Sequence, residues 1–125
     1  MARKPTLLIG DSEMEVLNHV WELKEATVAQ VQQAILKDRK IAYTTVMTIM
    51  QNLSKKGYLD FRRDGVTYIY TAAKDPSKVK KDFLGHLMNK VFKGSPTALM
   101  QTLVETEGIS DDEIDELRSI IDKLD

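Results

Sequence analysis

The chain has 125 residues, 42% of them hydrophobic and 30% charged, which is the composition of an ordinary globular protein with room for one good core or one small domain plus an appendage. It contains no cysteine, which excludes disulfides, thiolate metal sites and cysteine nucleophiles and fits a reducing cytoplasm. The net charge is −1, no apolar run is long enough for membrane insertion, and the opening segment MARKPTLLIG lacks the apolar core of a signal peptide, so we expect a cytoplasmic protein.

The first part of the chain predicts two helices. Apolar residues recur at helical spacing through residues 11–23, and Ser12 with Glu15 suits a capping box at the start of that helix. Thr27 with Gln30 suits a second capping box, which opens a shorter helix. The charged stretch that follows is expected to form a turn.

Residues 42–56 predict a third helix with an apolar face and a polar face. The apolar face carries Val46, Ile49, Met50 and Leu53, and the opposite face carries Thr44, Thr48, Gln51 and Lys55. Hydroxyl, amide and ammonium groups bind DNA phosphates and base edges, but an ordinary solvated helix face carries the same groups. Tyr43 and Thr45 begin the helix, where they either meet DNA or, for Thr45, only cap it. Met47 borders the polar face and either contacts a thymine methyl group or packs.

A β-hairpin with a basic tip is expected after this helix. Residues 58–63 and 66–71 predict two strands joined at Asp64-Gly65, a strong signal for a two-residue turn. Arg62 and Arg63 lie near the tip, either as solvated charges or as DNA contacts. Because side chains alternate along a strand, we expect only one of them to face DNA. A polar-faced helix followed by a basic hairpin is the layout of a winged-helix DNA-binding protein.

Residues 74–125 predict three further helices. Asp75-Pro76 and Ser95-Pro96 each combine an N-cap residue with proline at the first helical position, and Ser110-x-x-Glu113 suits a capping box. Three short amphipathic helices rarely enclose a stable core alone, so we expect them to pack against a second copy. The predicted dimer interface consists of Phe83, Leu87, Leu99, Leu103, Leu117 and Ile121.

The charges are distributed unevenly. Residues 37–63 hold seven Lys/Arg and two Asp/Glu, a local net charge of +5, and residues 74–93 hold six and two, a net of +4. Residues 105–125 hold two Lys/Arg and nine Asp/Glu, a net charge of −7. A nucleic-acid-binding protein needs a basic face rather than a basic total, so we expect the acidic segment to point away from DNA.

Catalysis finds no support in the sequence. His19 and His86 are isolated, and the acidic run at residues 111–116 complements the dipole of a helix N-terminus. There is no nucleophile–base set, no phosphate-binding glycine loop and no metal-ligand spacing. We therefore expect no enzyme activity, no cofactor and no metal.

Several segments resemble the BlaI/MecI family of bacterial penicillinase and methicillin-resistance repressors. They are DSEMEVLNHVW, YTTVMTIMQNLSKKGYL, VTYIY, NKVFKG and ISDDEIDELRSIID, in the order of that family and over nearly the whole chain. The resemblance implies a mainly α (α+β) fold with a winged helix-turn-helix domain in residues 1–73 and a three-helix dimerisation domain in residues 74–125. It also implies a homodimer that represses transcription by binding a palindromic operator in double-stranded DNA.

The chain departs from the family pattern at three places. In the best-known members a membrane-bound sensor protease is a partner and leads to cleavage of an Asn-Phe bond, whereas the matching positions here are Thr102 and Leu103, the candidate proteolytic site. The copper-responsive branch has a C-terminal cysteine cluster, which this chain lacks. Many members have arginine at the position of Asn52, so we expect this chain either to lack one phosphate contact or to have a different sequence preference.

Two functions are consistent with these observations. The first is a homodimeric repressor whose third helix enters the major groove. The second is a winged-helix interaction module whose basic face binds an acidic partner protein, for which the near-zero net charge and the absent arginine at Asn52 argue. For the first, the predicted DNA-binding residues are Tyr43, Thr44, Thr45, Met47, Thr48, Gln51, Asn52, Lys55, Arg62 and Arg63.

Overall fold

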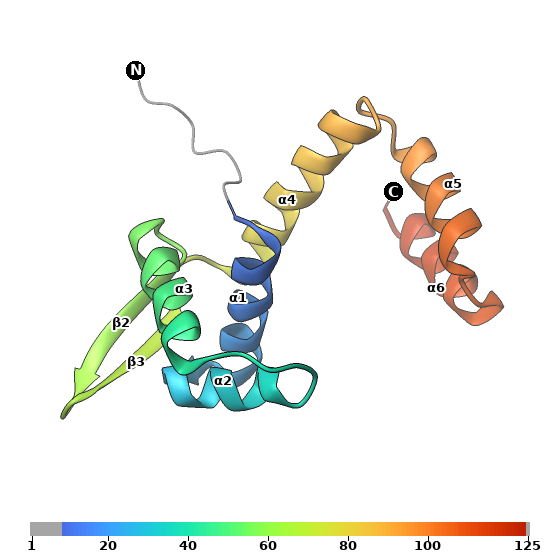
Figure 1. Cartoon of the computed structure of the whole chain (residues 1–125). Coiled ribbons are helices and arrows are strands. Elements are labelled where there is room, and N and C mark those ends of the chain that lie inside the picture. Colours follow the sequence, from blue (N-terminus) through green and yellow to red (C-terminus); the bar gives the residue numbers. More distant parts are fainter. Residues whose placement is uncertain (1–8, 125) are drawn as a thin grey trace, which may run out of the picture. The chain divides into compact units, whose positions relative to one another are not determined.

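The computed structural model describes residues 9–124, which form helices and a small antiparallel sheet (Figure 1). The elements in chain order are α1 (Asp11–Leu23), β1 (Glu25–Ala26), α2 (Val28–Leu36), α3 (Tyr43–Lys55), β2 (Leu59–Asp64), β3 (Thr67–Ala72), α4 (Pro76–Val91), α5 (Pro96–Glu107) and α6 (Asp111–Asp122). The mainly α fold with a short hairpin after the third helix is thus confirmed. No helix among the described residues combines the length and the apolar character that crossing a bilayer requires.

The N-terminal unit, which ends at Phe83, contains the hydrophobic core. Helices α1, α2 and α3 each bury one apolar stripe, because their apolar residues recur at three- and four-residue spacing. The buried residues of these helices are Val16, Leu17, Val20, Val28, Val31, Ile35, Val46, Met50 and Leu53. The sheet adds Ala26, Leu59 and Tyr70 to the same core.

Two of the predicted helix caps of the N-terminal unit can be compared with the structure. Thr27 and Gln30 form a reciprocal capping box, in which the Thr27 hydroxyl accepts from the Gln30 N–H at 3.2 Å and the Gln30 side chain accepts from the Thr27 N–H at 2.9 Å. The predicted box of Ser12 with Glu15 is wrong. Instead the Gly10 N–H donates to the Glu13 carboxylate at 3.1 Å, which leaves Glu15 available for an ion pair.

The sheet has the order β1-β3-β2, and all its strands are antiparallel. The β2–β3 hairpin, here called the wing, pairs Asp64 with Thr67, so its turn is Gly65-Val66, one residue later than predicted. Gly65 has a φ of +68°, and glycine at the first central position is the pattern of a type II′ turn. Strand β1 was not predicted, because two residues are too short for an alternation signal.

The C-terminal unit begins with Leu84 inside α4, so α4 belongs to both units. The first turns of α4 pack on the N-terminal core, where Val79 is 3% exposed and Phe83 is partly buried. By contrast, no residue of α5 or α6 whose side chain is described is buried. A domain boundary at residue 73 stays a prediction.

Candidate nucleic-acid interface

Helix α3 presents a continuous polar face to solvent. Val46, Met50 and Leu53 are fully buried, and they fix the rotation of the helix about its own axis. The opposite side is therefore exposed, and it carries Thr44, Thr48, Gln51, Asn52 and Lys55. Tyr43 and Thr45 are exposed in the first turn, while Met47 is half-buried at the edge of this face. Eight of the ten predicted DNA-binding residues lie on this helix, and the other two are the wing arginines.

Two ion pairs to α1 come from the residue just after α3 and from the loop between α2 and α3. The Lys56 ammonium, just after the last turn, contacts both carboxylate oxygens of Glu13 at 2.8 and 3.0 Å. Before the first turn, the Arg39 guanidinium donates to the Glu15 carboxylate. The hydrogen bond from Arg39 lowers the pKa of Glu15 below its ordinary value. Part of the basic charge of residues 37–63 is thus paired with carboxylates of α1.

Lys55 differs from its neighbour Lys56. Its side chain is exposed, and it forms no ion pair with any residue that the structure describes. An ammonium group on a flexible stem at the end of a polar helix face suits contact with a phosphate. The charge of Lys55 is therefore available to a ligand on the α3 face.

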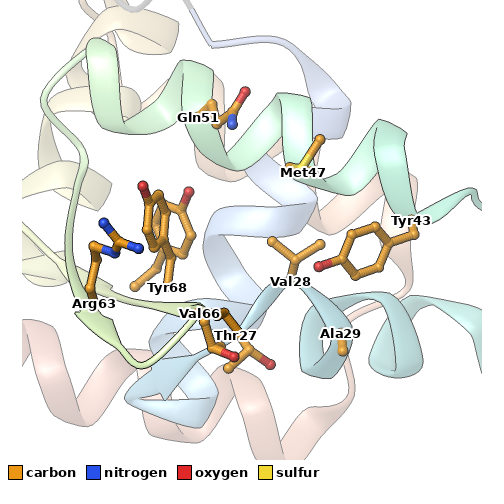
Figure 2. Close-up of a pocket in the computed structure, with 11 residues that line it drawn as sticks. Thr27, Val28, Ala29, Tyr43, Met47, Gln51, Arg63, Val66 and Tyr68 are labelled. Atoms are coloured by element: carbon orange, nitrogen blue, oxygen red, sulfur yellow. The ribbon is translucent and has the colours of Figure 1, made fainter.

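A hollow of about 630 Å³ separates α3 from the wing. Figure 2 shows Tyr43, Met47 and Gln51, four residues apart along α3, on one wall of this hollow. Arg63 and Tyr68 of the wing lie on another wall, and Thr27, Val28 and Ala29 at the start of α2 close one end. The hollow thus lies between the polar face of α3 and one face of the wing, and residues of both line it.

The two wing arginines lie on opposite faces of β2. Arg62 forms a two-pronged ion pair with Glu25 of β1, at 3.1 and 3.2 Å. The hydrogen bond from Arg62 lowers the pKa of the Glu25 carboxyl. Arg63 points to the other face, where its guanidinium lies 5.7 Å from the centre of the Tyr68 ring and lines the hollow. The alternation expected along this strand is present.

Aromatic side chains support the face of the wing that carries Arg63. The Phe61 ring stacks on Tyr68 with centroids 4.9 Å apart, and it contacts Tyr70 at 5.7 Å. Tyr70 is 2% exposed, so this cluster continues into the core. Burial raises the pKa of the Tyr70 hydroxyl above its ordinary value. Arg63 therefore lies against an aromatic cluster that is packed into the core of the N-terminal unit.

The predicted interface residues of the C-terminal half fall into different settings. Phe83 packs against the N-terminal core. Leu103 and Leu117 line a second hollow of about 540 Å³ between α5 and α6, whose other lining residues are Ile109, Glu113, Glu116 and Ile120. Leu99 is half-buried, while Leu87 and Ile121 are 41% and 58% exposed. Thr102, of the candidate proteolytic site, is exposed within α5.

Sequence reasoning missed several residues that shape this interface. Glu25, Glu13 and Glu15 were not singled out for the ion pairs they form. Tyr68 was not assigned to the hollow, although alternation along the hairpin places it opposite Arg63. No local signal connects Glu25 with Arg62, because the two residues are far apart in sequence.

Comparison with known proteins identifies the family. Residues 9–123 match the family model described as penicillinase repressor. The chain belongs to the penicillinase repressor family. It is 34% identical over 118 residues to the methicillin resistance regulatory protein MecI of Mammaliicoccus sciuri, which covers 94% of this chain and 96% of that protein. It is also 34% identical over 122 residues to the transcriptional regulator BlaI of Mycobacterium tuberculosis strain H37Rv, which covers 93% and 84% of the two chains.

Solved structures agree with this membership in the penicillinase repressor family. The DNA-binding domain of the repressor BlaI is 28% identical, with a TM-score of 0.52 over 62% of this chain and 92% of that domain. Wild-type MarR of Escherichia coli, in its apo form, is 13% identical with a TM-score of 0.54, over 93% of this chain and 77% of that one, and shows the fold alone. The resemblance inferred from the sequence is confirmed, and this penicillinase repressor family member is a winged-helix, DNA-binding transcriptional repressor.

Proposed function

We propose that this repressor acts as a homodimer on an inverted-repeat operator, with α3 of each subunit in a major groove. The observation that carries the proposal is the exposed polar face of α3 beside the hollow and the wing. An α-helix fits the major groove, where hydroxyl and amide groups such as those of Thr48 and Gln51 read base edges. Lys55 then lies at the groove edge, where the phosphates are.

The C-terminal unit supports the dimer. Its helices leave Leu103, Val104, Ile120 and Ile121 between 36% and 58% exposed, and none of the described side chains of α5 and α6 is buried. Apolar surface of this kind is removed from water when two copies pack together. Two-fold symmetry of the dimer then matches an inverted repeat in DNA.

A mobility-shift titration of the full chain on DNA from upstream of its own gene tests the proposal. The control is a duplex of the same length and base composition with a scrambled sequence, and both are titrated over a series of salt concentrations. We expect tight binding to the upstream DNA, with roughly 10³-fold or greater preference over the control. Equal binding to both duplexes, or no binding, would reject the operator function and favour a protein partner for the basic face.

A further inference from the structure

The two adjacent wing arginines are in different electrostatic environments, although the sequence alone does not say which of them faces DNA. Building on the proposed operator binding, we propose that Arg63 is the wing residue that contacts DNA, at a phosphate, and that Glu25 withholds Arg62 from DNA. Arg62 is then a positioning residue, which acts by fixing the wing to β1.

The first line of argument is the ion pair of Arg62. Both of its terminal nitrogens donate to the two oxygens of Glu25, at 3.1 and 3.2 Å, which is the fork-to-fork geometry of a matched pair. A DNA phosphate would have to displace a carboxylate that is already in place. Since Glu25 belongs to β1 and Arg62 to β2, the pair spans the sheet across β3 and limits the movement of the wing.

The second line is the setting of Arg63. Its guanidinium has no carboxylate partner among the described residues, and it lies beside the ring of Tyr68. Phe61 and Tyr70 support that ring, so the guanidinium is held by packing while its hydrogen-bond donors remain available.

The third line is the position of Arg63 relative to α3. It lines the same hollow as Tyr43, Met47 and Gln51. When α3 occupies a major groove of DNA, the DNA backbone that borders the groove runs beside the helix. The hollow provides the space for that backbone. A sugar-phosphate backbone in that space meets Arg63 from the wing, while the α3 side chains on the other wall face the base edges. Arg62 faces the opposite side of the sheet and cannot reach the same phosphate without leaving Glu25.

The test uses the full chain and a duplex of about 30 base pairs selected by the parent protein from a randomised pool, which spans two half-sites one helical turn apart. Arg63→Ala and Arg62→Ala remove the same charge from neighbouring residues, so each is the matched control of the other. Arg62→Glu alone and the reversed pair Glu25→Arg/Arg62→Glu test the positioning role. Dissociation constants are measured over a series of salt concentrations for each protein.

We expect Arg63→Ala to weaken binding roughly tenfold and to make the slope of log K against log salt shallower by about 1 per subunit bound. Arg62→Ala should leave the slope unchanged and weaken binding less than about threefold, because it loosens the wing without removing a phosphate contact. Arg62→Glu should bind poorly, and the reversed pair should recover affinity to within about twofold of the parent, because it restores the ion pair.

Arg63→Gln removes the charge but keeps most of the side chain beside the Tyr68 ring, so it replaces Arg63→Ala if that variant fails to fold and should make the slope shallower by the same amount. A slope change for Arg62→Ala equal to that for Arg63→Ala would overturn the inference. So would an unchanged slope for Arg63→Ala, or a reversed pair that binds as poorly as Arg62→Glu. If the parent itself selects no DNA sequence, the proposed operator function fails, and this inference fails with it.

Discussion

At the scale of single residues, buried side chains decide which polar side chains are available for DNA. Val46, Met50 and Leu53 have no exposed surface, so the rotation of α3 is fixed and Gln51 and Lys55 point outward. The two differ in chemistry. An amide reads a base edge, while an ammonium group neutralises a phosphate of any sequence.

We therefore expect opposite signatures from two substitutions on α3. Gln51→Ala should cost roughly 1–3 kcal/mol of binding free energy on the preferred site and little on unrelated DNA. Lys55→Ala should weaken binding to all sequences similarly and make the salt slope shallower by about 1. Competition titrations with selected and scrambled duplexes measure both effects. If both variants keep the affinity and the sequence preference of the parent, the assignment of this face is wrong.

Tyr70 gives a prediction for stability at high pH. Burial raises its pKa above the ordinary value of about 10, so the folded state holds the hydroxyl proton more tightly than the unfolded state. The stabilisation is complete below about pH 10 and is lost as the pH rises through the folded-state pKa. Tyr70→Phe should thus flatten the fall of the melting temperature above about pH 10. Burial also raises the pKa of Tyr58, which is still present in the Tyr70→Phe variant. Part of the fall in melting temperature should therefore remain.

The sequence predicted the elements of the candidate site but not how their side chains are paired. Helical periodicity was enough to separate the two faces of α3, because burial of an apolar stripe leaves one rotation for the helix. It placed Lys55 rather than Lys56 on the polar face, but it could not show that Lys56 forms an ion pair or which of Arg62 and Arg63 does. The partners Glu13 and Glu25 lie 43 and 37 residues away in sequence, so only the folded chain brings the pairs together.

At the scale of elements, α4 contributes to the N-terminal unit as well as to the C-terminal one. Val79 is buried in the N-terminal core, and Phe83, one turn later, packs against it. The ammonium group of Lys80 lies 5.5 Å from the centre of the Trp21 ring of α1. The first turns of the helix therefore contact α1 and the N-terminal core before the helix continues into the C-terminal unit.

A fragment that ends at residue 83 should consequently be more stable than one that ends at residue 73. Within the longer fragment, Val79→Ala should lower the free energy of unfolding by roughly 1–3 kcal/mol, because it removes buried methyl groups. Lys78→Ala changes an exposed side chain in the same turn and should have little effect. Urea denaturation measures all four proteins. Equal midpoints for the two fragments would show that α4 adds nothing to this core.

The elements themselves were predictable to the extent that local chemistry specifies them. Capping boxes and proline at the first helical position marked the starts of α2, α5 and α6, and the structure confirms these caps. The hairpin turn moved by one residue because Asp64-Gly65 and Gly65-Val66 are both acceptable turn pairs, and pairing with β3 selected the second. Strand β1 exists only because β3 offers it an edge.

At the scale of the whole molecule, the proposed dimer would use apolar surface that one chain leaves exposed. Leu103 and Leu117 line the hollow between α5 and α6, and Glu113 and Glu116 lie at the same place. The apolar contact between α5 and α6 encloses too little surface to hold the three C-terminal helices firmly without a partner. In the proposed dimer, association of two chains would couple the stability of the C-terminal unit to the spacing of two α3 helices on DNA.

The decisive prediction concerns Leu117→Asp. The substitution places a carboxylate in the apolar surface where the second copy is expected to pack, and burying an unpaired charge there is strongly unfavourable. Sedimentation should show a dimer for the parent chain and a monomer for the variant at micromolar concentration. Ser119→Asp adds the same charge at an exposed position of α6 and should remain dimeric.

Loss of the dimer should weaken operator binding without altering a single contact to DNA. Tethering makes the second half-site contact intramolecular, which raises affinity by about 10²–10⁴, and Leu117→Asp removes that gain. Affinity for an isolated half-site should stay within about twofold of the parent, because α3 and the wing are unchanged. Cleavage at Thr102-Leu103 would act in the same way, by separating α6 from the rest of the chain. Equal operator affinity of the monomeric variant and the parent would show that dimerisation is not what holds the repressor on its site.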